Sequence, residues 1–173
     1  MKKFFLSLLL VSLTAASSYA QDSSRSVKMY LSTEAGGATM LKKDSPILCD
    51  FSVNPGCRIG NFQVFVPVTL GCRLWETEGL RNFSLNGLLG LGAGYSIPLG
   101  KAQDCIEINL SCSPTVIKDT YDYLSSRMAL NWCARREGQR IYPYIGLSGY
   151  CVTPYDRSLP SNFYLGFSIG FGL

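Results

Sequence analysis

Seven cysteines and the complete absence of histidine set the chemistry that this chain of 173 residues could carry. Without an imidazole there is neither a Ser–His nor a Cys–His nucleophile pair, and most zinc sites lose their usual nitrogen ligand. No two cysteines have CxxC spacing, and the glycine-rich residues 89–94 lack the following helix that a phosphate-binding loop needs. We therefore expect no catalytic residue, no cofactor and no metal site, and a protein that is not an enzyme.

The cysteines lie at positions 49, 57, 72, 105, 112, 133 and 151, and their odd number leaves at least one thiol unpaired. Cys49 and Cys57 flank Asn54-Pro55-Gly56, which is a turn signal. This pair is the candidate disulfide if the chain reaches an oxidising compartment. The alternative, which we favour, is that the cysteines are mostly free, buried thiols that behave as small apolar side chains.

Charged residues are the other groups that could do chemistry. Arg73, Glu107 and Arg127 each lie on the small, polar face of a segment with alternating apolar residues, and Glu34 and Arg135 are further candidates. These charges could line a pathway for a substrate or ion, or they could form a structural network in which opposite signs pair. We favour the structural network, with Glu107 and Arg127 as the preferred pair because their segments are neighbours in the sequence.

The segments that carry these residues have the pattern of β-strands. Apolar residues alternate with polar or small ones, and no window has a convincing helical period. Seven such segments are clear, at residues 27–32, 62–74, 83–97, 105–112, 127–133, 144–150 and 163–173. An eighth is inferred at residues 47–53, because single-chain bacterial barrels have an even number of strands.

The final segment, residues 163–173, has the clearest two faces. Its odd positions are all large and apolar, and its even positions are Tyr, Gly, Ser, Gly and Gly. A strand between lipid and a narrow barrel interior has this pattern, although a secreted β-sandwich is the alternative. Inner-face glycines and aromatic residues toward strand ends favour the barrel. The aromatic residues expected at the membrane interfaces are Trp75, Tyr95, Trp132, Tyr142, Tyr144 and Tyr150.

The N-terminus predicts export. Met1-Lys2-Lys3 is a positive region, residues 4–13 are almost wholly apolar, and Ser18-Tyr19-Ala20 is a cleavage signal. The apolar run is too short for a transmembrane helix, so we expect a signal peptide at residues 1–20 and one domain at residues 21–173. Two lysines leave with the signal peptide, which makes the mature chain nearly neutral and excludes nucleic acid as an expected partner.

Short and long connections alternate between the expected strands. Residues 98–101 and 136–139 have the composition of tight turns. Longer polar stretches lie at residues 42–47, 75–82, 113–120 and 153–161. If the last strand runs toward the periplasm, both tight turns are periplasmic and the longer stretches are extracellular loops.

On these grounds the chain resembles the small outer-membrane β-barrel families, of which the OmpA and OmpX barrels and the porin-family barrel domains are typical. The resemblance rests on the signal peptide, on alternating strands such as residues 64–73 and 89–97, and on the terminal strand. It implies an all-β, antiparallel, up-and-down transmembrane barrel of eight strands in a Gram-negative type of outer membrane. One departure is the final residue, Leu173, where such barrels usually end on an aromatic residue.

The resemblance also implies a function and partners. We expect a structural or surface-interaction protein that acts through its extracellular loops, contacts outer-membrane lipid and the barrel-assembly machinery, and meets an extracellular or envelope partner of unknown identity. The alternatives are a porin-like channel for small solutes and a secreted soluble β-sandwich that binds a ligand. An eight-stranded barrel is just wide enough for side chains to fill, which opposes the channel.

Overall fold

The computed structural model describes residues 27–41, 45–77, 79–100, 104–117, 122–134, 140–156 and 158–173. The predicted signal peptide at residues 1–20, Arg135 and the predicted turn at residues 136–139 lie outside them. Among the described residues, no helix is long and apolar enough to cross a membrane. The strands are β1 (Val27–Thr39), β2 (Ile47–Ile59), β3 (Phe62–Phe65), β4 (Val68–Thr77), β5 (Leu80–Leu89), β6 (Leu91–Pro98), β7 (Cys105–Ile117), β8 (Tyr123–Cys133), β9 (Tyr142–Pro154) and β10 (Asn162–Gly172).

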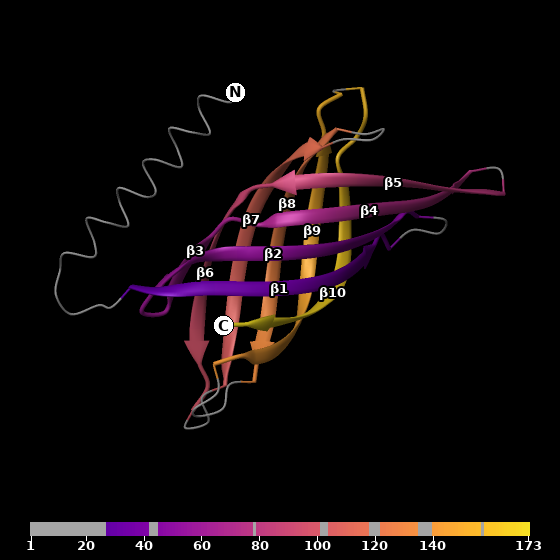
Figure 1. The fold of residues 1–173 in the computed structure, drawn as a ribbon. Coiled ribbons are helices and arrows are strands. Elements are labelled where there is room, and N and C mark those ends of the chain that lie inside the picture. The colour runs from indigo at the N-terminus through magenta and orange to yellow at the C-terminus, as the bar shows by residue number, and fades with distance from the viewer. Residues whose placement is uncertain are drawn as a thin grey trace.

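The sheet closes on itself, because β1 pairs antiparallel with both β2 and β10. In Figure 1, strands β1, β2, β4 and β5 cross in front of the steeper β7 to β10, as strongly tilted strands of a closed barrel do. The amide of Leu173 donates a hydrogen bond of 2.8 Å to the carbonyl of Leu31 and extends the seam between the first and last strands. A closed ring has no free edges, so the sandwich alternative is wrong.

The ten strands make a ring of eight, because two of the ring positions are interrupted strands. β3 and β4 pair with β2 in one continuous register, and β5 and β6 face them in the same way. The first interruption falls at Val66 and Pro67, where proline has no amide to donate. The second falls at Gly90, whose amide donates to the Pro67 carbonyl at 3.0 Å. The predicted count of eight strands, with the second at residues 47–53, is therefore confirmed.

Gly90 forms a corner of the barrel. Figure 1 shows a sharp bend where β5 passes into β6. A Cβ atom at this position would overlap the Ser113 side chain and the Cys112 carbonyl on β7. The pairing of β5 with β7 also shifts by one residue next to this point, between Gly87 and Leu88. Glycine is needed here because the backbones of two strands approach too closely for a side chain.

The two faces of the sheet have opposite chemistry. On β10 the outward side chains are exposed, and Phe167 has 65% of its surface accessible. Large apolar side chains continue this outer belt on the other strands, for example at Leu70, Leu130 and Leu147. The inward side chains of β10 are Tyr164, Gly166, Ser168, Gly170 and Gly172. The assignment of faces made from the terminal segment is therefore confirmed.

Two sequence-based predictions, a turn at residues 54–56 and the candidate disulfide of Cys49 with Cys57, are wrong in this fold. Residues 54–56 do not form a turn, because β2 runs without a break past them. Cys49 and Cys57 are eight residues apart on one strand, which separates their Cα atoms by roughly 26 Å, whereas a disulfide needs about 4.4–6.8 Å. Both cysteines are free, and no bridge between them is compatible with β2.

The expected loops and aromatic belts also need correction. Strands β4 and β5 take up residues 75–77 and 80–82 of the loop expected at residues 75–82, Thr77 pairs with Leu80, and Gly79 has a φ of +78°. β7 extends to Ile117 and takes up much of the loop expected at residues 113–120. Tyr142, Tyr144 and Tyr150 point into the barrel, not toward lipid, since each is 5% exposed. These three side chains help to fill the interior, which in an eight-stranded barrel is just wide enough to be filled by side chains.

Candidate functional site: the charged interior and the loop end

Two ion pairs span the barrel interior. Arg58 on β2 lies with Nη2 2.6 Å from Oε1 of Glu107 on β7, and Arg127 on β8 pairs with Glu34 on β1. Neither pair joins neighbouring strands, so each connects opposite walls of the ring. The acids are almost fully buried, whereas 14% of each arginine side chain remains exposed. A buried charge without a partner is costly, so these pairs hold the interior together.

The first pair is the centre of a hydrogen-bonded cluster. This cluster lies near the end of the barrel where β6 is followed by β7 and β8 is followed by β9. Oε1 of Glu107 also accepts hydrogen bonds from Ser96 at 3.1 Å and from Tyr142 at 3.3 Å. Arg58 Nη2 donates to Oε1 of Gln63 at 2.6 Å, and the Gln63 amide donates to Asn109 at 2.7 Å. The Arg58 guanidinium also lies 5.0 Å from the centre of the Tyr30 ring. Side chains from six different strands thus meet at this one cluster.

The second pair is the centre of a cluster further along the interior. Arg127 also donates to Ser168 at 3.3 Å, and its guanidinium lies 5.3 Å from the centre of the Tyr150 ring. The Tyr144 hydroxyl donates to Oε2 of Glu34 at 3.2 Å. The Tyr150 hydroxyl donates to Asp50 at 2.9 Å. The hydroxyl groups of Tyr144 and Tyr150 therefore connect Glu34 and Asp50 to β9, the strand next to the one that carries Arg127.

The predicted pair of Glu107 with Arg127 is wrong. These residues are on neighbouring strands, but the register of β7 and β8 places Asn131 opposite Glu107 and Ser111 opposite Arg127. The two residues are thus four positions out of register, roughly 13 Å along the strand. Each of them pairs across the barrel instead.

Arg73 occupies a third place. Its side chain is on the inward face of β4, and its guanidinium lies 5.8 Å from the centre of the Trp75 ring. Both residues lie near the loop end, which is the end of the barrel where β4 is followed by β5 and β9 by β10. The structure therefore divides the predicted network of Arg73, Glu107 and Arg127 among three locations. Arg58 was missed because the apparent turn at residues 54–56 ended the alternation too early. Continuing the alternation from Asp50 through Asn54 would have placed Arg58 on the inner face.

Two small cavities lie inside the described part of the barrel. A cavity of about 50 Å³ is lined by Asp50, Thr69, Tyr123, Arg127 and other residues, and a second of about 10 Å³ lies beside Glu34. A water molecule needs about 10–15 Å³ of such space. These cavities therefore have room for a few water molecules beside the pair of Arg127 and Glu34.

The loop end carries a larger concave surface and an ordered turn. The concavity, of about 760 Å³, lies against the β4–β5 hairpin and is lined by Ile47, Leu74, Trp75, Glu76 and Arg81 among others. In the connection from β9 to β10, the carboxylate of Asp156 accepts bonds from the amide (3.0 Å) and hydroxyl (2.8 Å) of Ser158. These bonds stabilise the charged form and lower the pKa of Asp156 below its ordinary value. Aromatic, acidic and basic side chains are thus all present at this end.

A solved outer-membrane protein has a fold similar to that of this chain. Neisserial surface protein A (NspA) aligns with 86% of this chain and 98% of its own, with a TM-score of 0.51 and 12% sequence identity. The chain has the fold of the small outer-membrane barrels. The N-terminal β-barrel domain of OprF from Pseudomonas aeruginosa aligns with 86% of this chain and 100% of its own, at a TM-score of 0.47 and 11% identity. No protein-family model matches the sequence, and no curated protein matches it.

Proposed function

We propose that this protein is an outer-membrane barrel with a closed interior, which anchors the loop end at the cell surface for contact with an envelope or extracellular partner. The observation that carries the proposal is the combination of an apolar outer belt with two ion pairs that cross the lumen. The belt fits a lipid environment, and the ion pairs oppose the passage of solutes. No catalytic step follows from this arrangement of groups.

Strand length and surface chemistry support insertion in a membrane. A transmembrane strand needs about 9–11 residues at a tilt near 45°, and β1, β2 and β7 to β10 have 11 to 13. In water, a continuous belt of exposed Leu, Ile and Phe would be an aggregation surface. In an outer membrane, lipid covers this belt, and the barrel-assembly machinery would close the seam between β1 and β10. The predicted signal peptide at residues 1–20 supplies export to that compartment.

The loop end is the proposed contact surface. The concavity beside the β4–β5 hairpin offers the Trp75 ring next to Glu76 and Arg81. Large aromatic and arginine side chains are the groups that most often dominate binding energy at protein interfaces. We infer that a protein partner binds here, with Trp75 and Arg81 as its main contacts.

Three measurements test the proposal. The folded protein should be recovered in the outer-membrane fraction and should change its gel mobility on boiling, as closed barrels do. Purified protein in planar bilayers should give no steady conductance, whereas the R58A/E107A variant should conduct more because it lacks one of the ion pairs. Recovery in the soluble fraction would contradict the membrane location. Steady conductance from the unaltered protein would favour the small-solute channel.

A further inference from the structure

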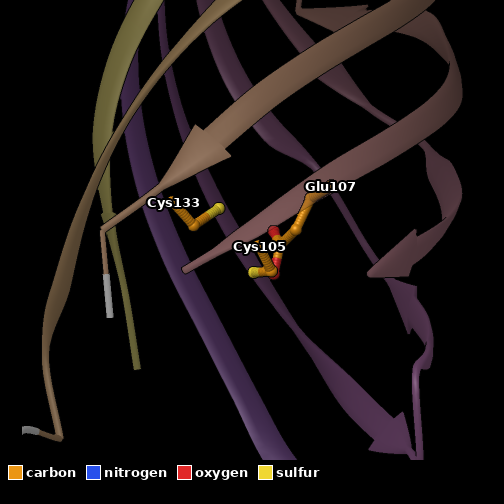
Figure 2. Close-up of side chains that lie close together, drawn as sticks. All are labelled: Cys105, Glu107 and Cys133. Carbon is orange, nitrogen blue, oxygen red and sulfur yellow. The ribbon is translucent and has the colours of Figure 1, made fainter. Parts of the chain in front are cut away.

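Two cysteines face each other inside the barrel beside Glu107. Cys105 is the first residue of β7, Cys133 is the last residue of β8, and the two are direct partners in the strand register. Their sulfur atoms and a carboxylate oxygen of Glu107 all lie within 4.8 Å of one another. Figure 2 shows the three side chains converging from the two strands. At most 3% of any of these residues is exposed, so the three donor groups are enclosed by the barrel.

We propose that Cys105, Cys133 and Glu107 bind one thiophilic divalent cation of the zinc class, with water as the fourth ligand. Thiolate sulfur and carboxylate oxygen are ligands for this ion at about 2.3 Å and 2.0–2.2 Å, in a tetrahedral arrangement. Two sulfur atoms on such an ion are about 3.8 Å apart. The three donor atoms all lie within 4.8 Å of one another, so side chains already grouped at this spacing need to move by about 1 Å at most to reach it. The site is independent of the proposed function, because nothing in it depends on the membrane or on the loop end.

The charges around the site favour a cation. Two thiolates and one carboxylate carry three negative charges, and a divalent ion together with the Arg58 guanidinium carries three positive charges. The cluster is therefore neutral when the ion is bound, which a buried site requires. The bonds from Arg58, Ser96 and Tyr142 all go to Oε1 of Glu107. They fix the orientation of the carboxylate beside the two thiols, as hydrogen bonds around metal ligands commonly do.

A second opposed pair of cysteines provides the matched control. Cys49 on β2 and Cys72 on β4 are also direct partners in the register, but their side chains are on the outer face. Among the described residues, only Cys105, Cys133 and Glu107 form such a group of three donor atoms. A property of opposed cysteines in general would appear at both pairs, whereas metal binding should appear at the inner pair alone.

The experiment uses the full chain, purified in its folded form from the cells that produce it. Cobalt is titrated into protein kept free of oxygen, followed by cadmium as a competitor. The expected result is one ion per chain, with the intense absorption of a cobalt ion held by two thiolates. This spectrum is recorded on the unaltered protein, so it does not depend on whether a variant folds.

Variants then assign the ligands. C105S and C133S should each weaken binding at least ~10-fold and remove one thiolate contribution from the spectrum. R58Q/E107Q should weaken binding while both thiolate contributions persist, and C49S/C72S should leave affinity and spectrum unchanged. Three results would overturn the site: no saturable binding, full binding by C105S/C133S, or a Cys105–Cys133 disulfide found by mass spectrometry in protein purified without reductant.

Discussion

Arg58 on β2 and Glu107 on β7 lie on opposite walls of the barrel, yet Nη2 of the arginine is 2.6 Å from Oε1 of the glutamate. Only 1% of the Glu107 side chain is exposed, so the pair is largely desolvated. The energy of such a pair is visible mainly when one partner is removed, because the other charge then stays buried and unpaired.

E107Q should therefore lower the free energy of unfolding by about 3 kcal/mol, and R58Q by a similar amount. The double variant R58M/E107M should recover most of that loss, because apolar side chains of similar size leave no buried charge. Denaturant unfolding in detergent, followed by the gel mobility of the folded form, measures all three. Additive losses in the double variant would show that the two side chains do not act as a pair.

The pairing of Arg127 gives a second test, by double-mutant cycles. Arg127 should couple to Glu34 by at least about 0.5 kcal/mol, because the two side chains are in contact. Arg127 and Glu107 should show a coupling near zero, since they belong to different clusters. The cycles use R127Q with E34Q and R127Q with E107Q, each measured by the same unfolding assay. A larger coupling to Glu107 would restore the pairing expected from neighbouring strands.

The strands were predictable from the sequence, whereas the ion pairs were not. Alternation along a strand depends only on neighbouring residues, so the faces of residues 163–173 and seven of the strands could be deduced. The even number of strands in such barrels supplied the eighth. Contacts such as Arg58 with Glu107 depend on the tilt and stagger of the whole ring, which no single segment encodes. The register of β7 with β8 excludes the predicted pair of Glu107 with Arg127, and a local pattern does not reveal that register.

One turn signal was also ambiguous for a physical reason. Asn54-Pro55-Gly56 has the composition of a turn, but Pro55 occupies a position where its carbonyl accepts the Val66 amide at 2.8 Å. A proline is tolerated in a strand where no amide is needed at its position. Local composition cannot distinguish that case from a turn. The wrong choice produced both the candidate disulfide of Cys49 with Cys57 and the omission of Arg58.

Gly90, at the barrel corner, should not tolerate a side chain. G90A should destabilise the fold by roughly 1–3 kcal/mol, because the added methyl group overlaps the Ser113 side chain and the Cys112 carbonyl. G37A is the matched control, since the nearest atom to its added Cβ would be the Leu48 carbonyl oxygen at an ordinary 3.9 Å. The yield of folded barrel and the unfolding midpoint report both changes. Equal effects of the two substitutions would contradict the close approach at Gly90.

The turn at Asp156 should respond to acid. Its pKa is lowered by the hydrogen bonds from Ser158, so the charged carboxylate is favoured in the folded turn. This contribution to stability is present above the pKa of the unfolded chain and is lost as the pH falls through the lower, folded value. An NMR titration of the Asp156 carboxyl group should give a pKa that rises in S158A, which removes the hydroxyl donor. An unchanged pKa in S158A would leave only the backbone amide as the cause.

The outer belt gives the most direct test of the membrane environment. Phe167 points outward from β10 with 65% of its surface exposed, so F167R adds a charge to the face proposed to contact lipid. Near the middle of a bilayer such a change costs about 2–4 kcal/mol, whereas on a surface facing water it costs little. L159R is the control, because Leu159 is exposed in the connection between β9 and β10, outside the strands. Refolding into lipid vesicles should be strongly impaired for F167R and nearly normal for L159R. Normal vesicle refolding of F167R would place this face of β10 in water and would contradict the proposed membrane location.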